Sequence, residues 1–263
     1  MKHSESSFTG LDGFNIFCQS RLPEGEPRAV LLVAHGYAEH SSRYGNLVEH
    51  FVPKGYAIHA LDHRGHGRSD GERVQVGNFE DYVTDLKTFF DLIRAQHAAE
   101  KIFLVGHSMG AAIAVVHAAL HQEGLEGVVF SGGGIALPDD PPPPPRPSGQ
   151  KLAAALSRDP AVAEAYVNDP LVYTGPPPER RFALAGMREK MPERAEIISV
   201  PVLIMAGGSS PLGEGPRSKN LYETVSSTDK ELKLSPELLH EIFNEPEHPQ
   251  VFADLEAWLE PRL

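Results

Sequence analysis

The sequence predicts an α/β protein with a mostly parallel sheet and helices on both faces. Two observations lead to this class. Short continuous apolar runs, typical of strands buried on both faces, alternate with longer segments of helical periodicity. One such run is followed directly by Gly-His-Ser-Met-Gly and then by a small, helix-forming segment. Because strands that alternate with helices are joined by right-handed crossovers, these strands are expected to be parallel.

Length and composition fit this class and limit the function. A chain of 263 residues suits one large α/β domain with an inserted subdomain. The net charge of −12 argues against nucleic acid as a partner and against electrostatic docking on anionic lipid, so we expect little or no contact with a membrane surface. We expect a monomer or a homodimer.

Cysteine usage and the apolar runs bear on the compartment. Cys18 is the only cysteine, so an internal disulfide is impossible and a reducing compartment is favoured. No apolar signal region is visible near the N-terminus, and no apolar run is long enough to span a bilayer. We therefore predict a cytoplasmic protein without a transmembrane segment.

The predicted elements follow one another along the chain. An Asp-Gly turn within 8–20 indicates a hairpin at the edge of the sheet. Buried strands are expected at 29–34, 56–61, 102–105, 127–130 and 200–206, and a last strand at 230–234. Helices are expected at 41–52, 79–97 and 250–259, each with apolar residues on one face. Further helices are expected from 111 onward, where a small apolar run begins, and around Leu221 and Tyr222, ending near Ser226.

The segment 101–120 carries the strongest chemical signal. A strand, a Gly-x-Ser-x-Gly turn and a helix in this order are typical of a nucleophile elbow. The sharp turn strains the backbone of Ser108 and exposes its hydroxyl at the carboxyl end of the strand. Positions two before and two after are too crowded for side chains, which explains Gly106 and Gly110. We therefore expect Ser108 to be a nucleophile.

Two backbone N–H groups are candidates for stabilising an oxyanion beside Ser108. The strand at 29–34 ends in His35-Gly36, and in elbow hydrolases the loop after this strand supplies one donor. The expected donors are the N–H of Tyr37 and the N–H of Met109. A plain strand-ending turn at His35-Gly36 is the alternative.

A histidine-rich loop follows the strand at 56–61. Its residues His59, Asp62, His63 and His66 raise the question of a metal site. Their spacing fits no standard zinc pattern, and glycines break the loop. We expect a polar loop held by internal hydrogen bonds, and neither a metal nor a cofactor.

These motifs together resemble the monoacylglycerol lipase family of α/β-hydrolases, also described as lysophospholipase-like esterases. The resemblance rests on HGYAEHSSRY, LDHRGHGRSDGER, LVGHSMG and the later DKELKL…HE. It implies an α/β-hydrolase fold with a mostly parallel eight-stranded sheet and a helical cap. It also implies a serine hydrolase that cleaves one fatty acyl chain from glycerol, so the expected partner is a small-molecule ester.

The family resemblance also divides the chain. Residues 1–134 and 200–263 are expected to form the hydrolase core, and 135–199 an inserted cap. The cap begins with a proline run that predicts a stiff spacer, rather than a ligand for a proline-binding module. Helical patches are expected at 151–156, 160–166 and 179–189. The cap is alanine-rich and looks shorter than in the family, which makes a short-chain carboxylesterase an alternative.

The catalytic acid is where this sequence departs most from the family. The family pattern after the strand at 200–206 is Gly-x-x-Asp, and Ser210 stands in the place of the acid. Glu214, four residues on, is the nearest carboxylate and a candidate substitute. Without an acid, we expect binding but slow hydrolysis, since comparable losses lower turnover by on the order of 10⁴-fold.

His240 occupies the place of the family's catalytic histidine, after the last strand and before the last helix. Glu237 stands where the family usually has glycine, which predicts strain if that position needs a positive φ. The resulting hypothesis is ester hydrolysis by Ser108 and His240 through an acyl-enzyme. A catalytically weak, hydrolase-fold binding protein is the alternative, and the distance from His240 Nδ1 to its nearest carboxylate is the informative observation.

Overall fold

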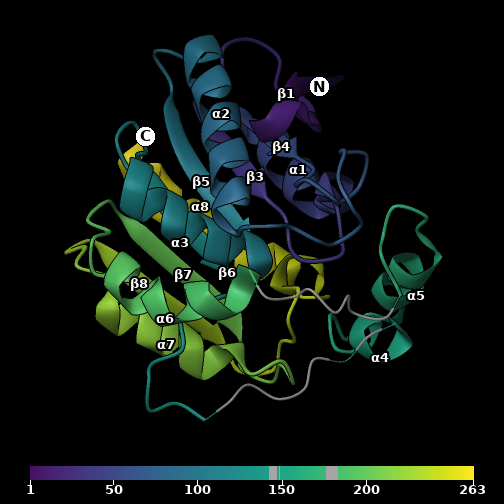
Figure 1. The fold of residues 1–263 in the computed structure, drawn as a ribbon. Helices are drawn as coiled ribbons and strands as arrows, with labels where there is room; N and C mark the ends of the chain where they lie inside the picture. The colour runs from purple at the N-terminus through teal and green to yellow at the C-terminus, as the bar shows by residue number, and fades with distance from the viewer. Residues whose placement is uncertain (142–146, 148, 176–182) are drawn as a thin grey trace.

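The strands form one sheet with a single antiparallel edge (Figure 1). The computed structural model describes residues 1–141, 147, 149–175 and 183–263, and over these residues the sheet is eight-stranded with the order β1-β2-β4-β3-β5-β6-β7-β8. The strands are β1 (Lys2–Thr9), β2 (Asn15–Leu22), β3 (Ala29–Ala34), β4 (Tyr56–Leu61), β5 (Lys101–His107), β6 (Gly127–Ser131), β7 (Val202–Gly207) and β8 (Lys230–Ser235). β1 and β2 run antiparallel to each other, β2 runs antiparallel to β4, and the other neighbours pair in parallel.

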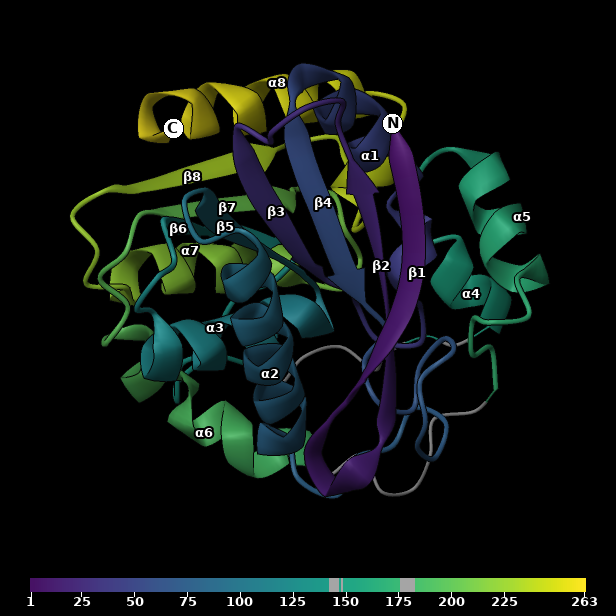
Figure 2. The ribbon, with the colours of Figure 1, turned by 90° about the horizontal axis from the view of Figure 1, so that it is seen from above.

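Helices cover both faces of the sheet (Figure 2). One face packs against α1 (Gly45–Phe51) and α8 (His248–Leu259), and the other against α2 (Glu80–Gln96), α3 (Met109–His121) and α7 (Glu214–Thr224). Each face has its own apolar cluster, because β3, β4 and β5 are buried on both sides and send alternate side chains to each. The predicted fold class is confirmed.

Several predicted elements differ in extent from the observed ones; for example, the helix expected to end near Ser226 is α7, which begins at Glu214. β1 begins at Lys2, well before the expected hairpin, and its exposed side chains explain why no apolar pattern announces it. The predicted helix at 41–52 is interrupted: a 3₁₀ turn at Ser41–Arg43 precedes α1. Further 3₁₀ turns lie at Leu11–Gly13, Val52–Lys54, Ile242–Asn244 and Glu260–Arg262.

The inserted segment contributes to two different places. The helices α4 (Gly149–Ala153) and α5 (Pro160–Asn168) form a small apolar cluster that lies apart from the sheet in Figure 1. In contrast, α6 (Ala183–Ala195) packs against α3 and α7, and Met191 and Ala195 belong to the core. All of the proline run Pro141–Pro145 except its first residue, and the start of the predicted helix at 179–189, lie outside the described residues.

The division at 134/135 and 199/200 remains a prediction. We use "cap" below for α4, α5 and the chain that joins them. Among the described residues, none of the helices has the length and apolar character needed to cross a membrane.

Candidate active site

Ser108 lies in the strained turn that the sequence predicts. Its φ of 54° and ψ of −112° place a non-glycine residue in a backbone region that is rarely occupied. A Cβ on Gly106 would come within 2.5 Å of the Gly110 carbonyl oxygen, and one on Gly110 within 2.0 Å of the Ala34 carbonyl oxygen. Only glycines fit at both positions, so the turn brings Ser108 to the carboxyl ends of β3 and β5.

The loop after β3 lies directly against this serine. A Cβ on Gly36 would come within 3.2 Å of Ser108 Cβ, so the loop backbone approaches the nucleophile as closely as glycine permits. The next residue is Tyr37, whose N–H is one predicted oxyanion donor. The other predicted donor, Met109, is the first residue of α3, where a backbone N–H has no partner within the helix.

His240 is held by Glu214. The distance between His240 Nδ1 and Glu214 Oε1 is 2.8 Å, and both side chains are buried. Burial alone raises the pKa of Glu214, but the hydrogen bonds from His240 and Ser210 and the imidazolium charge hold it below its ordinary value. Glu214 is therefore an ionised acceptor for the Nδ1–H of His240 at neutral pH.

Ser210 supports this carboxylate rather than the histidine. Its Oγ donates to Glu214 Oε2 at 2.8 Å. Gly213 adopts a left-handed conformation, with φ 72°, and is the N-cap of α7, whose first residue is Glu214. The negative charge at this helix N-terminus is favourable. Ser210, which stands at the expected acid position, and His240 therefore both contact the carboxylate of Glu214.

The loop before His240 packs against the loop after β7, backbone to backbone. A Cβ on Gly207 would come within 1.9 Å of the Leu239 carbonyl oxygen, which explains the glycine there. The strain considered for Glu237 does not occur, because Glu237 is not among the described residues that adopt a positive φ. The turn is held by Ser209 N–H, which donates to Leu238 O at 3.1 Å.

A buried charge network joins the two loops of the site. Arg43 donates to both carboxylate oxygens of Glu241, at 2.6 and 2.9 Å, and to Glu39 Oε2 at 3.0 Å. Glu39 Oε1 accepts from Gly36 N–H at 2.6 Å and from the Tyr44 hydroxyl at 3.0 Å. Arg43 therefore connects the loop that carries Tyr37 to the residue after His240.

The network determines the ionisation of its members. Burial raises the pKa of Glu241, but the Arg43 charge and its hydrogen bonds outweigh burial and lower it to about 2. His107, whose ring centroid lies 4.9 Å from that of His240, has its pKa lowered to about 4 by burial and by that neighbour. His107 is therefore neutral at pH 7.

The cap closes over the site and is tied to the core. Leu152, Leu156 and Tyr166 line a cavity of about 10 Å³ together with Ser108 and His240. This is room for about one water molecule, so the site is closed in this structure.

Polar contacts hold the cap in this position. His40 Nε2 lies 2.9 Å from Asp169 Oδ2, and Tyr173 N–H donates to Ala38 O at 2.8 Å. Glu241 N–H donates to Leu156 O at 2.7 Å. The residues that follow α5 thus attach the cap to the loop after β3.

The loop after β4 uses its polar residues internally. Asp62 accepts from Ser41 N–H at 2.8 Å and from Arg68 N–H at 2.9 Å. His63 N–H donates to His35 Nε2 at 2.9 Å, and His59 contacts His97. Over the residues the structure describes, no His, Cys, Asp and Glu group is arranged to hold a metal ion.

Sequence reasoning did not assign Glu39, Arg43, Glu241 or His107. The first three stand inside the motifs HGYAEHSSRY and HE, but a motif does not indicate which of its charges pair. Loop residues follow no repeating pattern from which their partners could be predicted. The structure shows that Arg43 pairs with Glu241, 198 positions further along the chain.

A sheet of this order with a serine on a strand–turn–helix elbow defines the α/β-hydrolase class. The family model described as "Serine aminopeptidase, S33" matches residues 25–247. A monoacylglycerol lipase from Mycolicibacterium smegmatis is 36% identical over 274 residues, which cover 99% of this chain and 98% of that protein. Monoglyceride lipase from Homo sapiens is 30% identical, covering 95% and 88%. The chain therefore belongs to the monoacylglycerol lipase-like family of α/β-hydrolases.

Solved structures agree. Monoacylglycerol lipase from Paleococcus ferrophilus superposes with a TM-score of 0.76 at 26% identity over 100% of both chains. A carboxyl esterase from Bacillus coagulans shares the fold, with a TM-score of 0.82 at 24% identity over 99% of each chain. These relatives are ester hydrolases, and the chain is a member of the same class of enzymes.

Proposed function

We propose that this protein hydrolyses carboxylic monoesters of the monoacylglycerol type through an acyl-enzyme, with Ser108, His240 and Glu214 as its catalytic triad. The observation that carries the proposal is the 2.8 Å contact between Glu214 and His240 Nδ1, because His240 lines the same cavity as Ser108. It supplies the carboxylate that the position of Ser210 lacks. The slow hydrolysis expected from the sequence applied only if no other carboxylate reached His240.

The first half of the reaction forms the acyl-enzyme. Ser108 Oγ attacks the ester carbonyl carbon while His240 Nε2 takes the hydroxyl proton. Nε2 is buried and has no hydrogen-bond partner within the described part of the chain, so it can accept a proton. The Tyr37 and Met109 N–H groups stabilise the oxyanion, and Glu214 stabilises the imidazolium. The alcohol leaves with the proton from His240.

The second half releases the acid. Water attacks the acyl carbonyl, gives its proton to His240, and the Ser108 oxygen leaves as the hydroxyl again. Because the cavity now holds about one water molecule, substrate entry requires Leu152, Leu156 and Tyr166 of the cap to move.

The proposal is tested with a fluorophosphonate probe and a substrate panel. We expect the probe to label the wild type and to leave Ser108→Ala unlabelled. The panel contains 1-monoacylglycerols, p-nitrophenyl esters of increasing chain length and an aminoacyl p-nitroanilide. We expect the protein to hydrolyse the esters and not the anilide. Hydrolysis of the anilide without hydrolysis of the esters would show that the protein is a peptidase and not an esterase.

Two alternatives have specific support. The small cap favours a short-chain carboxylesterase, for which turnover would peak on the shortest esters and be low on monoacylglycerols. The replacement of the family acid by Ser210 favours a binding protein without turnover. Absence of probe labelling in the folded wild type, with retained binding of monoacylglycerol, would favour this second alternative.

A further inference from the structure

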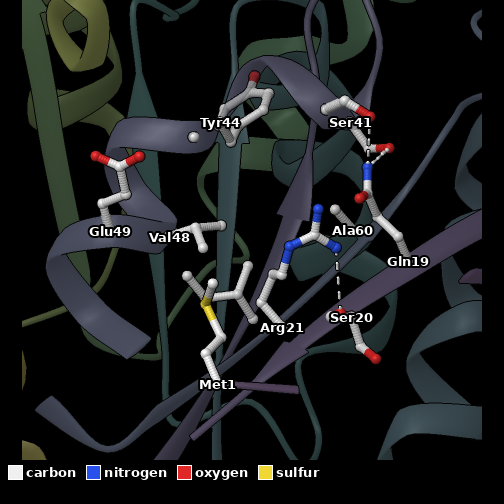
Figure 3. Close-up of a pocket in the computed structure, with 12 residues that line it drawn as sticks. Met1, Gln19, Ser20, Arg21, Ser41, Tyr44, Val48, Glu49 and Ala60 are labelled. Atoms are coloured by element: carbon white, nitrogen blue, oxygen red, sulfur yellow. Dashed lines mark hydrogen bonds between the residues drawn. The ribbon is translucent and has the colours of Figure 1, made fainter. Parts of the chain in front are cut away.

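A second cavity lies on the face of the sheet that α1 covers (Figure 3). It measures about 200 Å³ and opens between α1 and the strands β2 and β4. Side chains alternate along β2, so Gln19 and Arg21 point to this face while Ile16 points to the other. Because α1 is only seven residues long, it leaves part of this face uncovered. The cavity is thus separate from the one that Ser108 lines.

Arg21 brings a positive charge into this cavity that is not paired with a carboxylate in the described part of the chain. Figure 3 shows its guanidinium between Val48 and Gln19, below Tyr44. Its Nη1 donates to the Ser20 carbonyl oxygen at 3.4 Å, which is a long contact, and no carboxylate among the described residues pairs with it. Burial lowers the pKa of Arg21 without any opposing charge. An arginine in this setting favours an anionic partner.

Two hydroxyl groups add donors beside the guanidinium. The Gln19 amide donates to Ser41 Oγ at 2.6 Å and to Ser42 Oγ at 2.9 Å. Each hydroxyl therefore uses acceptor capacity for Gln19 and keeps its own proton for another acceptor. Together with Arg21, these groups suit the two oxygens of a carboxylate.

Part of the lining is apolar. Ile58, Ala60 and the partly buried Val48 supply this apolar surface. The cavity's volume of about 200 Å³ compares with about 10 Å³ for the cavity that Ser108 lines, so it has room for a small organic molecule. The size and lining suit a short hydrocarbon chain attached to the carboxylate. Glu49 lies at the far end, beyond Val48 in Figure 3, where its charge opposes an anion.

We propose that this cavity binds a short-chain monocarboxylate, with its head on Arg21, Ser41 and Ser42 and its chain over Ile58 and Ala60. The proposal does not depend on the reaction at Ser108. A bound carboxylate would contact Tyr44, whose hydroxyl donates to Glu39, the residue that holds Gly36 N–H. The cavity is therefore connected to the loop that carries Tyr37.

The test is a titration of the ¹⁵N-labelled protein with hexanoate, followed by backbone amide shifts. We expect shifts at Gln19, Ser42 and Gly45 that saturate, and none there with 1-hexanol or with inorganic phosphate. Arg21→Met should weaken binding at least tenfold, because it removes the charged donor. Glu49→Gln should tighten binding, because it removes the opposing charge.

A matched control is Arg68→Met, which removes an exposed arginine that pairs with Glu5 and should leave binding unchanged. If Arg21→Met does not fold, Arg21→Lys is compared with Glu49→Gln instead, and opposite changes in affinity are expected. Hexanoate shifts confined to the residues around Ser108, equal binding of 1-hexanol, or unchanged affinity in the Arg21 variant would each overturn the proposal.

Discussion

Replacing Glu214 by glutamine tests the acid assignment most directly. The glutamine keeps the size of the side chain, and its amide oxygen still accepts from His240 Nδ1, but it carries no charge to stabilise the imidazolium. In comparable triads, replacing the acid by its amide lowers kcat by about 10⁴-fold, equivalent to roughly 5.5 kcal/mol of transition-state stabilisation. We expect a loss of this order for Glu214→Gln, measured as kcat on a p-nitrophenyl ester.

The matched control lies on the same helix. Glu223 is an exposed carboxylate near the end of α7, so Glu223→Gln makes the same chemical change away from His240 and should leave kcat unchanged. Ser210→Ala should lower kcat by roughly tenfold, because it removes one hydroxyl that donates to the carboxylate. Wild-type kcat in a folded Glu214→Gln variant would refute the assignment of the acid.

The remaining predictions concern the network, a buried histidine and the cap. Arg43→Met should lower kcat at least tenfold, because it leaves Glu241 buried without its partner, and Arg43→Lys should lower it less, because the positive charge remains. An NMR titration of His240 in both variants then separates the loss of the charge from a shift of Glu241. His117 has no hydrogen-bond partner among the described residues and a pKa lowered by burial to about 3. Below pH 6.5 His117 takes up a proton in the unfolded chain but stays neutral in the folded one. The free energy of unfolding therefore falls as the pH is lowered from about 6.5 to about 3, and it is unaffected by His117 above pH 6.5. His117→Leu should therefore gain about 2 kcal/mol more at pH 5 than at pH 8, measured by urea unfolding; equal gains would contradict the neutral state. Asp169→Ala should make the cap more sensitive to proteolysis and change KM more than kcat, since Asp169 contacts His40 and not the reacting atoms.

The sequence predicts the sheet and the elbow well for physical reasons. Strands buried on both faces must be apolar throughout, which marks 29–34 and 56–61 with their observed bounds. The elbow depends on contacts too close for any Cβ, so Gly106 and Gly110 identify it without knowledge of the partner strands. In both cases the environment of a position restricts which residue type can occupy it, so the residue type identifies the environment.

The parts that the sequence does not predict depend on distant segments. β1 is exposed along most of its length, so edge pairing with β2 leaves no apolar pattern. Arg43 and Glu241 pair across the site, and a charge by itself does not identify its partner. The cavity at Arg21 exists because α1 is short relative to the sheet it covers, which is a property of packing rather than of any motif.

The start of α7 explains why a carboxylate at position 214 goes together with a hydroxyl at position 210. Ser210 Oγ lies 2.8 Å from Glu214 Oε2, so an aspartate at 210 would place a second carboxylate beside the one that already contacts His240. Two like charges at this distance cannot both ionise readily, and the pKa of one would rise. A hydroxyl at 210 avoids this repulsion and donates to the carboxylate instead. Ser210→Asp alone should therefore fail to raise the rate, whereas the same substitution combined with Glu214→Gln should recover part of the lost kcat, because one charged carboxylate again lies near His240. A large gain from Ser210→Asp alone would mean that Glu214 leaves the triad without an effective acid.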